Sequence, residues 1–199
     1  MRGGGNVGVK QKFLGGLDLF FLFGRGIAAF DGTRAEALRS LAIPGGMLLF
    51  NLVYHGIWPY PPKGMEVGYS PQQIMGTVVA HVLLSIGLTS GFSYLVAWSL
   101  EKRERFWLLF SATNWTGLAG SVVAFPLSLM ATFAIAPREA MDRVFVILTL
   151  YTLCVSVCIV RRGLAVNWQL AVGIAIGGFS ISNELWHILY AVQGIPIPW

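Results

Sequence analysis

The chain contains five long apolar stretches, at 41–58, 73–100, 106–136, 144–160 and 169–192. A helix needs about 20 apolar residues to cross the roughly 30 Å hydrocarbon core of a bilayer, and each stretch meets or approaches that length. A membrane β-barrel would instead show segments of about ten residues with alternating apolar and polar side chains. The stretches therefore predict an all-α polytopic membrane protein with five transmembrane helices.

The composition agrees with an apolar surrounding. Hydrophobic residues make up 55% of the 199 residues, and charged residues only 12%. About a quarter of the residues of a soluble protein are charged, so this chain lacks the charge to cover a soluble globule of its size. Two cysteines are too few for a framework of disulfides. The composition argues against a soluble enzyme, a disordered chain and a disulfide-stapled secreted domain.

A shorter apolar run at 13–30 is interrupted by Asp18 and Arg25, which are seven residues apart and share one helical face. We predict an amphipathic helix that lies in the membrane interface. A re-entrant or sixth spanning segment is the alternative. The predicted organisation is a cytoplasmic N-terminal segment at 1–40, followed by a five-helix transmembrane domain at 41–199.

Capping residues and prolines set the expected helix ends. Residues 33–36, Thr-Arg-Ala-Glu, have the pattern of a capping box. Pro44 is predicted to break or kink the chain between a short helix starting at Arg34 and the first span. Pro126 predicts a kink inside the third span or a helix that protrudes. Pro137 is expected to open the fourth helix.

The basic residues predict the orientation. With the N-terminus in the cytoplasm, eleven of the 14 lysines and arginines lie in the inside segments and three in the outside segments. This bias satisfies the positive-inside rule and places the C-terminus on the opposite side. Attraction to an anionic inner leaflet explains the net charge of +5. The expected partner is therefore the lipid bilayer, with no nucleic acid.

Four segments of the sequence together carry a resemblance to a known family. They are AFDGTRAEALRS at 29–40, YPPKGMEVGYS at 60–70, ATNW at 112–115 and QGIPIPW at 193–199. On these phrases the chain resembles an uncharacterised family of five-span bacterial inner-membrane proteins that is loosely Yip-like in architecture. The resemblance implies a five-helix bundle in a bacterial inner membrane and brings no enzymatic motif. In such a membrane, the orientation predicted from the basic residues places the C-terminus in the periplasm.

Polar residues inside the spans are the candidates for function, because polar groups are costly in hydrocarbon. All three histidines of the protein are among them. With the N-terminus inside, three of the spans place polar groups at a similar depth below the outer surface. The candidate intramembrane polar site consists of Asn51, His55, His81, Glu184 and His187.

The helical period places the polar residues of each span on one face. On the second span, polar residues recur every fourth position at Thr77, His81, Ser85, Thr89 and Ser93. On the fifth span, Ser180, Glu184 and His187 share a face. Both faces are expected to point into the bundle, because lipid offers no hydrogen-bond partner.

Three interpretations of this layer stay open. The polar groups can serve as hydrogen bonds between helices, worth about 0.6 kcal/mol each. They can form a transition-metal or haem-type site, although Glu184-x-x-His187 occurs once, whereas di-iron bundles use two such motifs. They can form a proton or ligand pathway, with Glu184 titrating and His81 or His187 as relay. The sequence identifies no cofactor and predicts no metal ligands.

Small residues mark the expected contact faces. Gly87-x-x-x-Gly91 and Gly173-x-x-x-Gly177 allow close backbone approach, and we predict that they pack within the bundle rather than against a partner. No nucleophile elbow, P-loop, zincin or dinucleotide-binding motif is present. The leading hypothesis is a non-enzymatic accessory or organising membrane protein, with a membrane-protein partner or a homo-oligomer. The alternative is a transporter or membrane enzyme that uses the His/Glu layer.

Overall fold

A computed structural model describes residues 8–57, 71–132, 135 and 137–192, and within them the fold is all-helical. The elements in chain order are α1 (Val9–Phe20), the 3₁₀ helix η1 (Gly24–Ala29), α2 (Arg34–Ser40), α3 (Ala42–Ile57), α4 (Pro71–Ser99), α5 (Arg103–Thr132), α6 (Arg138–Gly163) and α7 (Trp168–Val192). The all-α prediction is confirmed for the described residues. Each of the five apolar stretches coincides with one of the helices α3 to α7.

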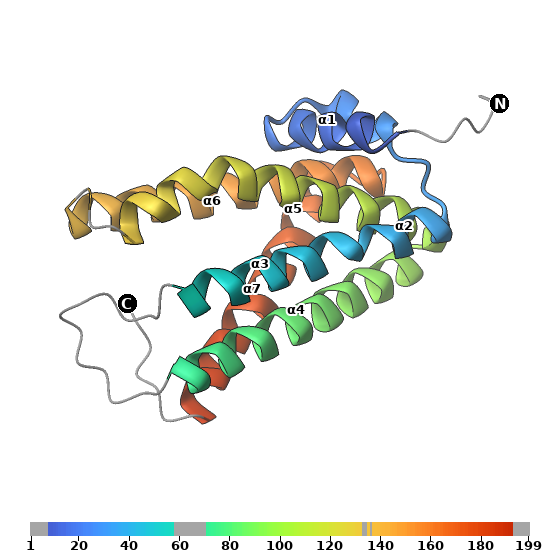
Figure 1. The fold of residues 1–199 in the computed structure, drawn as a ribbon. Coiled ribbons are helices and arrows are strands. Elements are labelled where there is room, and N and C mark those ends of the chain that lie inside the picture. Colours follow the sequence, from blue (N-terminus) through green and yellow to red (C-terminus); the bar gives the residue numbers. More distant parts are fainter. Residues whose placement is uncertain (1–7, 58–70, 133–134, 136, 193–199) are drawn as a thin grey trace.

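The long helices alternate in direction, so that consecutive helices run antiparallel (Figure 1). The closest neighbours are α4 with α7, α6 with α7, and α5 with α6. The turn between α4 and α5 meets the turn between α6 and α7, where Lys102 Nζ donates a hydrogen bond to the carbonyl of Ala165 at 2.6 Å. These two turns and the start of α2 therefore lie at one end of the bundle.

Among the described residues, three helices are long and apolar enough to cross a membrane, through their segments Met75–Ser99, Arg103–Leu127 and Glu139–Gly163. The prediction of five spans is thus supported for α4, α5 and α6. Helix α3 has 16 residues, which is below the usual length of a span. Helix α7 has 25 residues, but a polar segment in its second half lowers its mean hydropathy.

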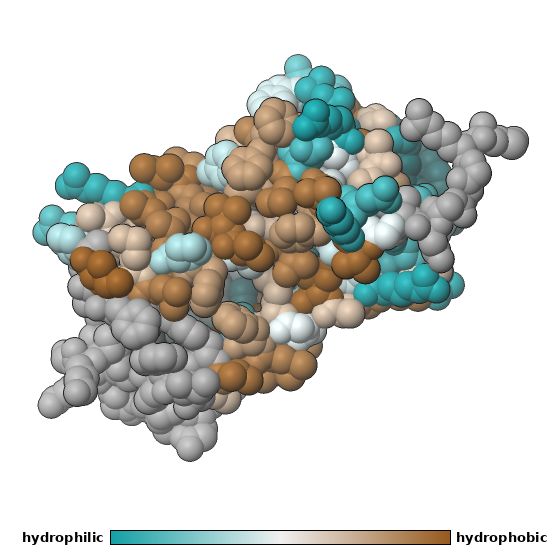
Figure 2. All heavy atoms as spheres, turned by 45° about the horizontal axis from the view of Figure 1, so that its top comes forward, coloured by the Kyte–Doolittle hydropathy of each residue, from teal (hydrophilic) through white to brown (hydrophobic). Residues whose placement is uncertain are grey.

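The surface between the two ends of the bundle is apolar. Large hydrophobic side chains are exposed along α4 and α6, including Leu83, Leu95 and Ile147. Figure 2 shows a hydrophobic band across the visible face, with hydrophilic residues gathered toward its ends and over the N-terminal segment. An exposed apolar surface of this extent is typical of a protein that associates with a membrane.

The N-terminal segment is a hairpin, and the predicted continuous helix over 13–30 is wrong. Helix α1 ends at Phe20, the chain reverses, and η1 packs back against α1. Asp18 and Arg25 form an ion pair with 2.9 Å between Oδ2 and Nε, but they do so across the hairpin rather than along one helix. The hydrogen bond that Arg25 donates to the carboxylate of Asp18 raises the pKa of Arg25.

The hairpin lies against α5 and α6 through small residues and one buried hydroxyl. Gly16 faces the backbone of Trp115, and the ring of Phe20 covers Gly120. The hydroxyl of Tyr151 on α6 donates a hydrogen bond of 2.6 Å to the carbonyl of Phe20. Because this carbonyl belongs to the last residue of α1, the bond satisfies an acceptor that the helix leaves open.

We expect Tyr151→Phe to lower the free energy of unfolding by about 1 kcal/mol, the usual net value of one such hydrogen bond. Thermal unfolding of the detergent-purified protein, followed by circular dichroism, measures the change. Tyr94→Phe is the matched control, because the ring of Tyr94 packs edge-on against Phe106 and its exposed side chain makes no hydrogen bond within the described residues. Equal melting temperatures for the two variants would contradict the prediction.

The predicted capping box is confirmed for Thr33, whereas the carboxylate of Glu36 has a different partner from the one that the pattern predicts. Thr33 Oγ1 accepts a hydrogen bond from the backbone N–H of Glu36 at 3.2 Å. The carboxylate of Glu36, however, accepts from the N–H of Asp31 at 2.7 Å. The chain before α2 curls closely enough for the N–H of Asp31 to reach this carboxylate.

The structure agrees with the prediction at Pro137 and differs from it at Pro44. Pro137 is the residue before α6, as expected. The break between α2 and α3 falls at Leu41, so Pro44 lies in the first turn of α3, where a missing N–H costs nothing. Helix α5 continues through Pro126 to Thr132.

Candidate functional site

His81 is the predicted site residue that the fold places most firmly. It lies on α4 with 9% of its surface exposed. Its Nε2 atom lies 3.2 Å from the carbonyl oxygen of Ser182 on α7, and its ring stacks on Trp186 with 3.8 Å between ring centroids. A carbonyl can only accept, so Nε2 donates in this hydrogen bond. His81 therefore joins α4 to α7.

Two hydroxyl groups extend this contact. Ser85 Oγ lies 2.8 Å from Ser182 Oγ and 3.4 Å from His81 Nε2. The predicted inward face of α4 is confirmed by these contacts, by the burial of Thr77, and by the position of Thr89 beside the same network. The spacing of four residues places these side chains one above another on the helix.

A cavity of 260 Å³ begins at this network and extends between α4, α5 and α7. Seven of its lining side chains are polar but uncharged: Ser85, Thr89, Ser90, Ser93, Thr113, Asn114 and Ser182. Phe106 and Phe110 contribute aromatic surface. The sequence pattern pointed to the α4 side of this cavity, whereas nothing in the sequence indicated that Thr113 and Asn114 of α5 face the same space.

Glu184 and His187 do not join His81, and the predicted inward face of α7 is wrong. Ser180, Asn183 and Glu184 are exposed, and His187 is half-buried. The side of α7 that packs into the bundle is the opposite one, which carries Ala171, Ile174, Ala175, Ser182 and Leu185. Small side chains there let α7 approach α4 closely, whereas turning Glu184 inward would bury a carboxylate without a cation.

The two predicted residues on α3 also stand apart from His81. Asn51 Nδ2 donates to the carbonyl of Met47 on its own helix at 2.9 Å. Its side chain lines a largely apolar groove of about 700 Å³ between α3 and α5. His55 belongs to α3, but its side chain lies outside the described residues. The predicted layer of imidazoles and a carboxylate is therefore not assembled among the described side chains.

The structure contains a second polar cluster that the sequence analysis missed. Glu36 on α2 is 5% exposed, and its Oε1 lies 3.0 Å from Lys12 Nζ of the hairpin. Ser111 of α5 donates to the same carboxylate oxygen at 3.3 Å. Beside it, Asn114 Nδ2 donates to Ser40 Oγ at 2.8 Å. The capping pattern indicated the backbone role of Glu36, but no spacing signal connects Lys12 with it.

The cluster reaches the cavity through Asn114, which lines the cavity and also bonds to the end of α2. One succession of polar groups therefore runs from Lys12 and Glu36 at one end of the bundle, along the cavity, to His81. Within the described residues no group of three or more His, Cys, Asp or Glu side chains is placed to hold a metal ion. Apart from the ion pair of Lys12 and Glu36, the chemistry that the arrangement supplies is hydrogen bonding by uncharged side chains.

Comparisons of the chain with family models, with curated proteins and with solved structures gave no match. The class that the fold defines is an all-helical protein with three apolar helices compatible with a membrane protein.

Proposed function

We propose that the chain is a five-span protein of a bacterial inner membrane, with α3 and α7 completing the bundle around α4, α5 and α6. Helix α7 packs against both α4 and α6. This position supports placing α7 at the same depth in the bilayer as α4 and α6. The N-terminal hairpin would enter the bundle as a re-entrant segment, because Gly16 lies beside Trp115 of α5 and the carbonyl of Phe20 accepts a hydrogen bond from Tyr151 at the middle of α6.

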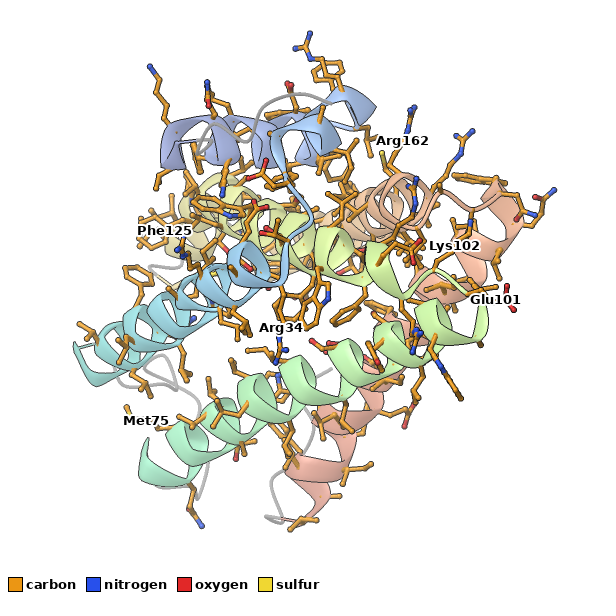
Figure 3. The ribbon with its side chains drawn as sticks, turned by 90° about the vertical axis from the view of Figure 1, so that its right-hand side faces the viewer. Arg34, Met75, Glu101, Lys102, Phe125 and Arg162 are labelled. Carbon is orange, nitrogen blue, oxygen red and sulfur yellow. The ribbon has the colours of Figure 1, made fainter. Side chains whose placement is uncertain are left out.

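The basic residues support a cytoplasmic N-terminus and a periplasmic C-terminus. Figure 3 looks onto the end of the bundle that carries Arg34 of α2, Lys102 of the turn between α4 and α5, and Arg162 of α6. A cluster of arginine and lysine at one end of a helix bundle is typical of the cytoplasmic side.

Within that bundle we propose a binding site for a small, neutral, hydrogen-bonding solute, as in a transporter. The observation that carries the proposal is the cavity of 260 Å³ lined by seven uncharged polar side chains from three helices. Polar groups inside membrane bundles face the interior or a water-filled cavity and mark solute pathways. Among the described residues no charged side chain lines the cavity, so a neutral solute is favoured over an ion.

The lining also suggests how such a solute would be held. Hydroxyl and amide groups offer both donors and acceptors, while Phe106 and Phe110 offer apolar faces. The volume lies just below the usual range of ligand pockets, about 300–1,000 Å³, which limits the solute to a small molecule such as a short polyol or amide. His81 would fix the outer edge of the cavity by holding α4 to α7 through Ser182.

A test of this proposal is the reactivity of single cysteines with a small charged thiol reagent, in a background carrying Cys154→Ala and Cys158→Ala. Ser90→Cys places a thiol in the cavity, and Leu88→Cys places one on the exposed apolar face of the same helix. We expect rapid labelling of Ser90→Cys from water and labelling at least about tenfold slower of Leu88→Cys, since thiols ionise poorly in hydrocarbon. Glycerol and urea should slow the labelling of Ser90→Cys if they enter the cavity.

The possible results separate the parts of the proposal. Equal labelling at both positions would place α4 in water and overturn the membrane arrangement. Labelling at neither position would mean a dry cavity and would overturn the solute site. Labelling of Ser90→Cys that no solute slows would leave a hydrated cavity without a binding function.

A second candidate function is that of an accessory or organising protein acting through helix contacts, which was the leading hypothesis from the sequence. The observation in its favour is that a side chain added at Gly87 or Gly91 of α4 would meet no atom within 4 Å. The expectation that this glycine pair packs within the bundle is therefore wrong, whereas Gly177 does pack against the ring of Phe92. Glycine faces of this kind allow another helix to approach closely. Loss of co-purifying proteins on Gly87→Leu would favour this candidate.

A further inference from the structure

Helix α7 carries a polar stripe on the side that faces away from the bundle. The exposed residues Gly173, Ile176, Ser180 and Asn183 recur at alternating intervals of three and four, and half-buried His187 continues the series. Exposed Glu184 lies on the same side, four residues after Ser180 and three before His187. This spacing follows one face of a helix. The stripe lies opposite the face of Ala171, Ala175, Ser182 and Leu185 that packs into the bundle.

The side chains at the polar end of this stripe have no hydrogen bond or ion pair within the described residues. Asn183 and Glu184 are exposed, and His187 is only half-buried. If α7 spans the bilayer, as the proposed function states, this end of the stripe faces lipid. A carboxylate that faces hydrocarbon is costly, and neither the lipid tails nor the described residues offer it a partner.

We infer that the stripe is the interface between two copies of this chain, related by a two-fold axis parallel to α7. Glu184 and His187 are three residues apart, which is about 4.5 Å along a helix. In a parallel pair, Glu184 of each copy can therefore reach His187 of the other. A carboxylate and an imidazole on the same face form a self-complementary set, as an isologous interface requires.

The rest of the stripe fits close contact between two helices. Gly173 and Ser180 are small and seven residues apart, which is the repeat of a two-helix seam. A side chain added at Gly173 would meet no atom within 4 Å, so the groove beside it is open. Asn183 of the two copies would face each other near the axis, and paired amides can donate and accept mutually. A second copy thus offers a partner to Asn183, Glu184 and His187.

Cysteine cross-linking in native membranes tests the inference. In the background lacking Cys154 and Cys158, Ser180→Cys places a thiol at the centre of the stripe. Ser182→Cys, two residues away on the same helix, places one against α4. We expect mild oxidation to link Ser180→Cys into a covalent dimer and to leave Ser182→Cys monomeric.

Swapping the residues at positions 184 and 187 tests whether the partner is a second copy of this chain. Glu184→His alone and His187→Glu alone should each lower the yield of the Ser180→Cys dimer about fivefold, corresponding to about 1 kcal/mol per dimer. The double exchange should restore the yield, because each copy then offers the same pair in reverse. A partner other than a second copy would give a cross-linked band of different mass, and the double exchange would not rescue it.

Other outcomes also decide the question. Absence of any cross-link with Ser180→Cys, in a protein whose Ser90→Cys variant is still labelled from water, would overturn the dimer and leave the solute site standing. A cross-link that persists unchanged in both single exchanges would overturn the role of Glu184 and His187. Circular dichroism of each variant confirms that the helices are intact.

Discussion

Replacing Glu36 by glutamine should lower the free energy of unfolding by about 3 kcal/mol, the largest effect that we expect from any single conservative change in this chain. Glu36 is buried and lies 3.0 Å from the ammonium of Lys12, which is itself only 16% exposed. Removing one member of a buried ion pair leaves the other charge without compensation, at a cost of about 3–5 kcal/mol. The lower figure applies because glutamine keeps an oxygen that can accept from Asp31.

Thermal or urea unfolding of the detergent-purified protein measures this loss. A second variant, carrying both Glu36→Gln and Lys12→Met, should recover part of the stability, because no isolated ammonium remains. Arg25→Gln is the matched control, since it breaks the exposed pair with Asp18, in which the arginine side chain is 77% exposed. Exposed ion pairs contribute little to the free energy of unfolding, so the control should have the melting temperature of the wild type. Equal losses in Glu36→Gln and Arg25→Gln would refute the argument.

Gly16→Ala should destabilise the protein by about 2 kcal/mol, within the usual range of about 1–3 kcal/mol for overpacking. A Cβ atom at this position would lie 2.6 Å from the carbonyl oxygen of Trp115 and 2.8 Å from its carbon. Because both are backbone atoms of α5, no side-chain rotation relieves the clash. The hairpin must therefore shift away from α5, which weakens the contacts of Phe20 as well.

The melting temperature and the rate of proteolysis within the N-terminal 40 residues report this change. We expect the rate of cleavage to rise in Gly16→Ala while the cores of α4 to α7 stay protected. Gly117→Ala is the control on the facing helix, where an added Cβ would meet no atom within 4 Å. There the substitution should be neutral or slightly stabilising, because alanine favours a helix over glycine. A stable, protease-resistant Gly16→Ala protein would show that the hairpin does not depend on this close contact.

The structure explains why the polar face was predicted correctly on one helix and incorrectly on another. On α4, the residues from Thr77 to Ser93 form a polar side that is distinct from a side of leucines. On α7, two sides carry polar or small residues, one with Ser182 and the other with Ser180 and Glu184. The helical period identifies both sides but does not choose between them.

The prediction of one continuous helix over 13–30 was wrong for a related reason. Spacing alone placed Asp18 and Arg25 on one face of a helix, and the same pair is equally satisfied across a reversal of the chain. The contact of Lys12 with Glu36 joins residues 24 positions apart, and the one between Asn114 and Ser40 joins residues 74 apart. No local pattern specifies pairs of that separation.

The sequence by itself determined the helical class, the positions of α3 to α7, and the face by which α4 meets its neighbours, because long apolar runs and a period near four residues are local properties. Only the tertiary structure decided which side of α7 turns inward, that the N-terminal segment doubles back onto α5, and that Lys12 finds Glu36. The physical reason is that lipid and protein interior are similarly apolar, so hydrophobicity does not tell a buried face from an outer one. The close approach of small residues and the pairing of a few polar groups make that choice, and both depend on residues far apart in the chain.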